Sequence, residues 1–271
     1  MKPILKYPGA KWALAPWIVQ YLPRTPHYVE PYCGSAAVFF NLPWRPKHAV
    51  LNDLSGDIVN LFRVIRERGD ELAALIEMTP WAREEYELSY TPTDDSLERA
   101  RRFLVRTWQS HGAGSVVARN GWKHAGGDPA DGYMTRWIGM PARIDAIARP
   151  LVGVEIENRP ALEIVRRYAA GDVLIYADPP YVTDTRAGKL YAHEMTDADH
   201  LVLLDALDAH PGPVVLSGYH CALYDDRLAH WQTVETKAQA EKGNTRTEVL
   251  WLNAKAAGAR QHTMDLEIVN A

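Results

Sequence analysis

The sequence has little cysteine and no long apolar run, and these absences exclude several classes of protein. Only two cysteines, Cys33 and Cys221, occur in 271 residues, so neither a disulfide framework nor a cysteine-based metal site is expected. No stretch approaches 18 consecutive apolar residues, and the charged, proline-interrupted residues 1–6 do not resemble a signal peptide. We therefore expect a cytoplasmic protein without a membrane span.

Two further signatures are missing. The G-x-G-x-x-G fingerprint of a pyrophosphate site is absent from the turn that follows the first expected strand. His193 and His200, with acids between them, match no tetrahedral metal spacing, and a helix start with solvated histidines explains them better. The sequence therefore predicts no bound metal.

Charge is unevenly distributed along the chain. The net charge is −4, which by itself argues mildly against a nucleic-acid partner. Residues 70–98 carry nine acids and one base, whereas residues 99–149 carry nine bases and three acids, a local net charge of +6. The second segment is typical of a surface that faces a polyanion, although a solvated helix face fits the same pattern.

Alternating strands and helices predict an α/β fold. Strands are expected at 28–30, 49–53, 152–156, 172–177 and 214–217, with a closing hairpin of 232–234 and 248–252. Helices are expected at 57–68, 97–109, 160–170 and 197–209, the last with Thr196 as its N-cap. The alternation lapses between residues 70 and 150, and residues 112–139 show no sustained period. This order predicts a doubly wound sheet interrupted by an insert.

The most informative motif is Asp178-Pro179-Pro180-Tyr181, which follows an apolar strand. A carboxylate at the C-terminal end of a parallel strand lies where open α/β sheets bind ligands. The two prolines remove N–H donors and leave acceptors only, and Tyr181 adds an aromatic face. Together these groups suit an amino group on a flat heterocycle, while the alternative is an ordinary strand-ending turn.

The turn after the first strand indicates a nucleoside site. Gly34 and Ser35 are small enough for a ligand to approach the backbone, and Glu30 precedes them. Asp53 ends the second strand, where dinucleotide folds place the acid that binds ribose hydroxyls; the alternative is an aspartate of a turn or of a helix N-terminus. Tyr7 and Lys11, near the N-terminus, offer a ring to stack and an ammonium to pair with a carboxylate.

Several segments together resemble the DNA adenine N6-methyltransferase family. They are residues 6–11 (KYPGAK), 28–39 (YVEPYCGSAAVF), 52–53 (ND), 178–181 (DPPY) and 247–253 (TEVLWLN). Their order is similar to that of the alpha group of this family, in which the target-recognition insert lies between the cofactor and catalytic motifs.

The resemblance implies a Rossmann-like S-adenosylmethionine-dependent methyltransferase sheet formed by residues 1–69 and 151–271. Residues 70–150 would then form an inserted, mainly helical target-recognition region. The resemblance also implies that Asp178, Pro179, Pro180 and Tyr181 form the catalytic loop. The cofactor contacts expected from the motifs are Tyr7, Lys11, Glu30, Gly34, Ser35, Asp53 and Asp178.

Two departures from the family pattern stand out. The turn reads Cys33-Gly34-Ser35-Ala36 where many members carry more glycines, and residues 70–150 match no recognisable pattern. The recognition sequence in DNA therefore cannot be predicted from this chain.

The expected reaction is methyl transfer to adenine N6 in duplex DNA. Asp178 and the Pro179 carbonyl would accept the N6 hydrogens, and Tyr181 would stack on a flipped-out base. Three arginines, Arg99, Arg102 and Arg106, fall on nearly one helix face and would suit contacts with DNA phosphates. Four other polar residues lie in the glycine-rich stretch, and their side chains could bind base edges. Those four are Arg119, Asn120, Lys123 and Arg136.

Rival functions remain open at this stage. Cytosine N4 methylation uses similar chemistry and a similar loop, and a catalytically idle DNA-binding module could keep the fold. A protein glutamine methyltransferase is disfavoured because the loop begins with Asp rather than Asn. The target sequence, the oligomeric state and the biological role in restriction-modification, phage protection or regulation are not encoded in a readable way.

Overall fold

The computed structural model describes residues 1–112, 119–124, 132–182, 193–239 and 245–259. Its centre is a seven-stranded sheet with the order β3-β2-β1-β4-β5-β7-β6. The strands are β1 (His27–Glu30), β2 (His48–Asn52), β3 (Glu155–Glu157), β4 (Val173–Ala177), β5 (Val214–Gly218), β6 (Gln232–Gln239) and β7 (Thr245–Leu252). The predicted α/β sheet is thus confirmed.

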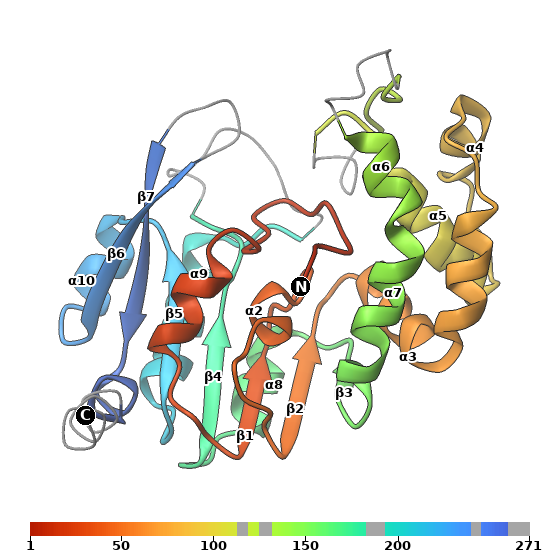
Figure 1. The fold of residues 1–271 in the computed structure, drawn as a ribbon. Helices are drawn as coiled ribbons and strands as arrows, with labels where there is room; N and C mark the ends of the chain where they lie inside the picture. Colours follow the sequence, from red (N-terminus) through yellow and green to blue (C-terminus); the bar gives the residue numbers. More distant parts are fainter. Residues whose placement is uncertain (113–118, 125–131, 183–192, 240–244, 260–271) are drawn as a thin grey trace, which may run out of the picture.

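The first five strands are parallel, and β7 is inserted antiparallel between β5 and β6. In Figure 1 the arrows of β1, β2 and β4 point to one edge, along which the N-terminal segment runs. The predicted closing hairpin is confirmed, although its strands are longer than expected. The strand expected at 152–156 is displaced, because residues 152–154 form a turn and β3 begins only at Glu155.

Helices cover both faces of the sheet. The helices are α1 (Ala15–Ile18), α2 (Ala37–Phe40), α3 (Gly56–Glu77), α4 (Arg83–Leu88), α5 (Ser96–Trp108), α6 (Tyr133–Ile138), α7 (Met140–Ala148), α8 (Ala161–Arg167), α9 (Asp197–Asp208) and α10 (Ala222–Arg227), with 3₁₀ turns at Val19–Tyr21 and Arg149–Leu151. The predicted cap of α9 is confirmed, since Thr196 Oγ accepts from Asp199 N and the Asp199 carboxylate accepts from Thr196 N.

Period-two alternation in the strands divides the core into two layers. Val173, Ile175 and Ala177 of β4 pack with α8, α9 and α10 on one face. Leu174 and Tyr176 of the same strand pack toward α1, α2 and α3 on the other face. Because both faces are buried, the strands are apolar almost throughout, which is why they could be recognised in the sequence.

The segment between α3 and β3 contains helices whose positions the sequence pattern did not indicate. The first helical stretch is interrupted at residue 68, where it was expected to end, because Arg68 has non-helical backbone angles; a second stretch then continues α3 to Glu77, which was not expected. Helices α4, α6 and α7 were not expected. Their short amphipathic stretches become helical by packing, as when Met140, Ile144 and Ile147 of α7 are buried.

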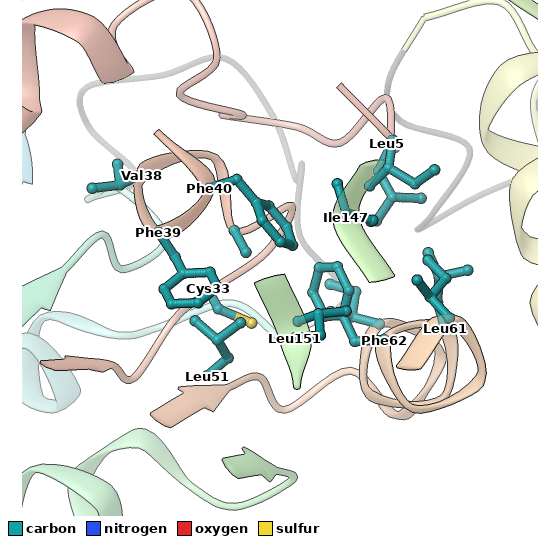
Figure 2. Close-up of a cluster of buried hydrophobic side chains, with 14 of the residues drawn as sticks. Leu5, Cys33, Val38, Phe39, Phe40, Leu51, Leu61, Phe62, Ile147 and Leu151 are labelled. Carbon is teal, nitrogen blue, oxygen red and sulfur yellow. The ribbon is translucent and has the colours of Figure 1, made fainter. Parts of the chain in front are cut away.

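These helices share a hydrophobic core with the sheet. Figure 2 shows Phe40 of α2, Phe62 of α3 and Ile147 of α7 in one cluster with residues of the sheet, and the Phe40 and Phe62 rings lie 6.0 Å apart. Trp108 and Trp137, from α5 and α6, belong to the same cluster. The helical region is therefore held in a fixed place beside the carboxyl ends of the strands.

Candidate active site

The strand order reverses between β1 and β4, and a cavity lies at that point. Chain connections leave β1 and β4 in opposite directions, and this switch point is where open α/β sheets bind ligands. The cavity has a volume of about 400 Å³, a size that suits a small-molecule ligand. Its lining includes all seven residues predicted as cofactor contacts: Tyr7, Lys11, Glu30, Gly34, Ser35, Asp53 and Asp178.

The turn after β1 is shaped by two left-handed residues. Gly34 has φ +48° and Ala36 has φ +50°, and Gly34 N donates to Asp53 Oδ2 at 2.9 Å. The positive φ favours glycine at this position, and a Cβ on Gly34 would lie 3.4 Å from the Tyr7 ring, in ordinary contact with it. The second oxygen, Asp53 Oδ1, accepts from Ser55 N at 2.8 Å. Asp53 thus fixes the turn and still faces the cavity.

Glu30 is a buried acid at the end of β1. Its Oε1 accepts from Phe39 N at 2.8 Å and from the Tyr28 hydroxyl. Burial raises the pKa of Glu30 to about 8, and these hydrogen bonds limit the rise. At neutral pH the side chain is therefore mainly protonated, which fits a buried group that has no cation against it among the described residues.

Asp178 pairs with Lys11 through one oxygen only. Lys11 Nζ lies 2.9 Å from Asp178 Oδ2 and also donates to the Gly9 carbonyl at 2.9 Å. Asp178 Oδ1 is buried and has no hydrogen-bond partner in the described part of the chain. Burial raises the pKa of Asp178 to about 6, and the Lys11 ammonium holds it from rising further. One strong acceptor is thus left for a ligand at the cavity wall.

The other residues of the 178–181 loop differ in position, since one faces the cavity and the others pack away from its lining. Pro180 lines the cavity, whereas Pro179 and Tyr181 are not among the described lining residues. Tyr181 is buried, its ring lies 4.8 Å from Lys11 Nζ, and its hydroxyl donates to Glu248 Oε1. Tyr219 meets the same ring edge-on at 4.5 Å.

Glu248 and Asn52 take part in the site although neither was predicted as a site residue. Glu248 is buried on β7 and lies 3.7 Å from Lys11 Nζ. Asn52 is fully buried, and its amide binds the Pro31 carbonyl and both backbone groups of Arg159, which joins two walls of the cavity. An acid in phase with Leu250 and Leu252 was a visible sign, because a buried carboxylate requires a partner.

The three arginines predicted to bind phosphates are engaged in ion pairs. Arg99 Nε and Arg106 Nη2 bind the two oxygens of Asp57 at 2.7 and 2.6 Å. Arg102 binds Glu98 at 2.6 Å and the Thr91 carbonyl at 2.8 Å. We call Arg99, Arg102 and Arg106 the paired arginines. Their contacts tie α5 to α3 and to the preceding loop.

A second group of cations surrounds the Tyr133 ring. Lys123 Nζ lies 3.0 Å, Lys6 Nζ 4.5 Å and the Arg136 guanidinium 5.7 Å from its centre. We call Lys6, Lys123, Arg136 and Tyr133 the Tyr133 cluster. No acid lies within 4 Å of these cations in the described ranges. Burial, with Lys123 and Arg136 nearby, lowers the pKa of Lys6 to about 8. Sequence reasoning did not include Lys6 among the DNA contacts.

The other two predicted DNA contacts lie beside the same region. The Arg119 guanidinium is 5.4 Å from the centre of the Tyr90 ring, and its side chain is exposed. The Asn120 side-chain amide donates to the His111 carbonyl at 3.1 Å, and the backbone carbonyl of Asn120 accepts from the Tyr86 hydroxyl. The structure thus places Arg119, Asn120 and Lys123 on one short stretch and Arg136 in the last turn of α6.

Comparison with known proteins assigns this arrangement to a family. The profile of the D12 class N6 adenine-specific DNA methyltransferases matches residues 7–241. The chain belongs to this family. It is therefore an S-adenosylmethionine-dependent enzyme that methylates the N6 amino group of adenine in DNA. Family membership decides for adenine N6 over cytosine N4.

Two curated relatives of this D12 class enzyme illustrate the similarity. The Type II methyltransferase M1.LlaDCHI of Lactococcus lactis subsp. cremoris is 28% identical over 212 residues, covering 72% of this chain and 71% of the relative. The DNA adenine methylase of Salmonella typhi is 23% identical over 261 residues, covering 90% and 91%. A solved S-adenosylmethionine-dependent methyltransferase from Agrobacterium tumefaciens has 10% identity and a TM-score of 0.37, covering 89% of this chain and 59% of that one.

The cavity of this D12 class enzyme fits S-adenosylmethionine in its chemistry. An unpartnered oxygen at Asp178, a glycine turn that approaches Tyr7, and the Asp53 carboxylate all line it. No group of three or more His, Cys, Asp or Glu residues suited to a metal ion occurs among the described residues. In the described helices, even the 22-residue α3 lacks the sustained apolar stretch that a bilayer crossing requires.

Proposed function

We propose that Asp178 is the acceptor that activates adenine N6 and that the seven cavity residues hold S-adenosylmethionine. The observation that carries this proposal is the state of the Asp178 carboxylate. One oxygen is held by Lys11, and the other is buried and unpartnered at the switch point of the sheet. A buried acceptor without a partner is costly to maintain, and a bound amino group removes that cost.

Each cavity residue suits a different part of the cofactor. Asp53 can accept from ribose hydroxyls while its two backbone hydrogen bonds keep it in place. Gly34 and Ser35 leave room beside the backbone, and the Tyr7 ring offers a stacking face. Bound S-adenosylmethionine supplies a methyl group on a positively charged sulfur, which an amino nitrogen can attack.

Asp178 acts on the nucleophile. The N6 lone pair is conjugated into the adenine ring, so acceptors that hold the N6 hydrogens make it more available for attack. Asp178 Oδ1 and the Pro179 carbonyl are the two acceptors proposed here. The bound cofactor would supply the methyl group, which would leave its bonding electron pair on sulfur, while Asp178 and the Pro179 carbonyl hold N6 in place to accept it. N6 then gives one proton to Asp178, whose pKa near 6 lets it pass the proton to water.

The base reaches Asp178 by leaving the DNA stack, because N6 is paired inside a duplex. We propose that the substrate is double-stranded and that Tyr181 packs against the flipped adenine. The Tyr181 ring is fixed by Glu248, Lys11 and Tyr219, and a fixed ring loses little entropy when a base stacks on it.

DNA contact is proposed for the Tyr133 cluster together with Arg119 and Asn120. Lys123 and Arg136 are anchored near the carboxyl edge of the sheet, and their cationic groups crowd enough to affect Lys6. Arg99, Arg102 and Arg106 were predicted as phosphate contacts too, but their ion pairs favour a structural role. We also propose that residues 70–150 recognise the target, and that the enzyme acts in the cytoplasm of a prokaryotic or phage-infected cell.

The test is the Asp178→Ala variant, assayed by transfer of labelled methyl groups to unmethylated duplex DNA with nucleoside analysis. We expect N6-methyladenine formation to fall by about 10³-fold or more, because the variant removes an acceptor aimed at developing charge. Asp172→Ala is the matched control, since Asp172 lies exposed at the opposite end of β4. A variant that folds, as shown by circular dichroism, and keeps wild-type turnover would refute the assignment.

A further inference from the structure

Glu248 stands out among the buried polar residues, because it contacts two members of the proposed site without lining the cavity. Its carboxylate accepts from the Tyr181 hydroxyl and lies 3.7 Å from Lys11 Nζ. Only 2% of Glu248 is exposed to solvent, so the carboxylate is retained in the core at a cost in desolvation. Nothing in the comparisons assigns a role to this residue.

The sheet explains how an acid near the end of the chain reaches the N-terminal segment. In β7, Leu250 and Leu252 pack into the core layer of α1, α2 and α3. Residue 248 is in phase with them and therefore points to the same layer, where Lys11 precedes α1. Val249 pairs with Gly218, the last residue of β5, which places Glu248 at the carboxyl edge beside the Asp178 loop.

Lys11 is held between two carboxylates of unequal distance. Its ammonium lies 2.9 Å from Asp178 Oδ2 and 3.7 Å from Glu248 Oε1, and it donates a hydrogen bond to the Gly9 carbonyl. A second carboxylate that attracts the same cation weakens the stabilisation that Lys11 gives to ionised Asp178. Asp178 therefore remains a better proton acceptor than it would be in an exclusive pair with Lys11.

We propose that Glu248 is a positioning residue for methyl transfer, fixing the Tyr181 ring through its hydroxyl and sharing Lys11 so that Asp178 stays a strong acceptor. This inference rests on the proposed function, in which Asp178 accepts from N6. Glu248 itself contacts neither the base nor the cofactor. Its effect is on catalytic rate rather than on binding, because the groups that line the cavity do not change.

Other ionisable groups near Asp178 do not replace this effect. The groups that act on its carboxyl are Lys11, Glu30, Tyr176, Tyr181, Tyr224 and Glu248. Burial raises the pKa of Glu30 to about 8 and the pKa values of Tyr176 and Tyr224 above their ordinary range, so these three are mainly uncharged at neutral pH. Burial raises the pKa of Asp178 most, and the charges of Lys11 and Glu248, together with the Tyr181 hydroxyl, adjust it further.

The test compares Glu248→Gln with the wild-type enzyme in pH–rate profiles at saturating cofactor and DNA. The amide keeps the size of the side chain and removes its charge. We expect kcat to fall by about tenfold, the scale for losing a charged hydrogen-bond partner, with KM for S-adenosylmethionine changed by less than about twofold. The acid limb of the profile should move to lower pH, because Glu248 raises the pKa of Asp178. An unmoved limb, or an unchanged kcat, overturns the proposal.

Two further variants keep the test decisive. Glu248→Asp retains the charge but is too short to hold Tyr181, so kcat should fall while the acid limb stays at its wild-type position; a moved limb contradicts the proposal. If Glu248→Gln does not fold, this variant carries the test alone. Glu235→Gln, which removes an exposed acid on the neighbouring strand β6, should leave both readouts unchanged.

Coupling to Tyr181 is measured by a double-mutant cycle. If Glu248 acts through the Tyr181 ring, the variant carrying both Tyr181→Phe and Glu248→Gln loses less activity than the product of the single losses. Independent losses would contradict positioning through Tyr181. The Asp178→Ala assay separates the two hypotheses. If the Asp178→Ala variant is active, the proposed function is refuted. If Asp178→Ala is inactive but Glu248→Gln has the same activity as the wild-type enzyme, only the present inference is refuted.

Discussion

The carboxyl edge of the sheet and the helical region beside it both concentrate charge, but they treat it differently. At the sheet edge, Glu30 and Glu248 are buried and Asp178 is half-buried, and the pKa values of Glu30 and Asp178 move far from the ordinary range. In the helical region, the paired arginines are neutralised by acids of the protein, while the Tyr133 cluster has cations packed on an aromatic ring. Burial thus changes the pKa values of the carboxyl groups at the sheet edge, whereas ion pairing within the protein determines which cations of the helical region can bind DNA.

The largest expected effect is on the pH dependence of the unfolding free energy, which the buried acid at the sheet edge should change and the exposed acid of the helical region should not. Glu30 has a raised folded pKa of about 8, so the folded state loses stability as pH rises from the unfolded value of about 4.5 through 8. Glu30→Gln does not ionise and keeps the acceptor for Phe39 N. We expect it to exceed the wild-type protein in unfolding free energy at pH 9 by a few kcal/mol, as an order of magnitude, with little difference at pH 5.

This comparison is measured by urea unfolding of the cofactor-free protein at both pH values. Glu71→Gln is the control in the helical region. Glu71 is exposed beside Arg68, which lowers the pKa of its carboxyl, so any stability it provides is lost only at acidic pH. Its variant should show no gain between pH 7 and 9. A Glu30→Gln protein whose difference from wild type does not grow with pH would remove the buried-acid interpretation.

The next effect tests the Tyr133 cluster through DNA affinity. Lys123→Ala combined with Arg136→Ala should raise the Kd for duplex DNA by about 10- to 100-fold and reduce the slope of log K against log salt by about 1.8, as expected for two phosphate contacts. Fluorescence anisotropy across a salt series gives both quantities. Arg102→Ala, from the paired arginines, is the matched control and should leave the slope unchanged. The same loss in both variants would abolish the distinction between the two groups.

The smallest effect tests the paired arginines through stability. Asp57→Asn removes the carboxylate that holds Arg99 and Arg106 and should lower the unfolding free energy by about 1 kcal/mol, since the groups are partly exposed. DNA affinity should not fall, because the two guanidinium groups are released rather than lost. Chemical denaturation and the anisotropy assay measure the two outcomes. Weaker DNA binding in this variant would mean that the ion pair itself shapes the interface.

The sequence was most informative where local pattern and global fold agree. The strands at 28–30, 172–177 and 214–217 are apolar because both faces of the sheet are covered, and the Thr196 cap follows from local hydrogen bonding. The acids and small residues after these strands meet at one cavity because parallel strands end at one edge. Sheet topology therefore brought Glu30, Gly34, Ser35, Asp53 and Asp178 together, whereas Tyr7 and Lys11 reach the cavity on the N-terminal segment.

The remainder depended on contacts between distant segments. Helices α4, α6 and α7 are short, and they form by packing, α4 against α5, α7 against α3 and α6 against α7, rather than from their own propensity. The i, i+3, i+7 spacing of the paired arginines was visible, but their partner Asp57 lies on another helix. The phase of Glu248 with the apolar residues of the closing strand indicated that it could be buried. Its partners could not be predicted, because Lys11 and Tyr181 come from other parts of the chain.

The position of β7 has a consequence for the order in which the protein is made. Translation releases Lys11 well before Asp178, and Asp178 before Glu248. Because β7 lies between β5 and β6, the sheet keeps a gap until that last strand enters. The pairing of Lys11 with both carboxylates therefore closes only after nearly the whole described chain has left the ribosome.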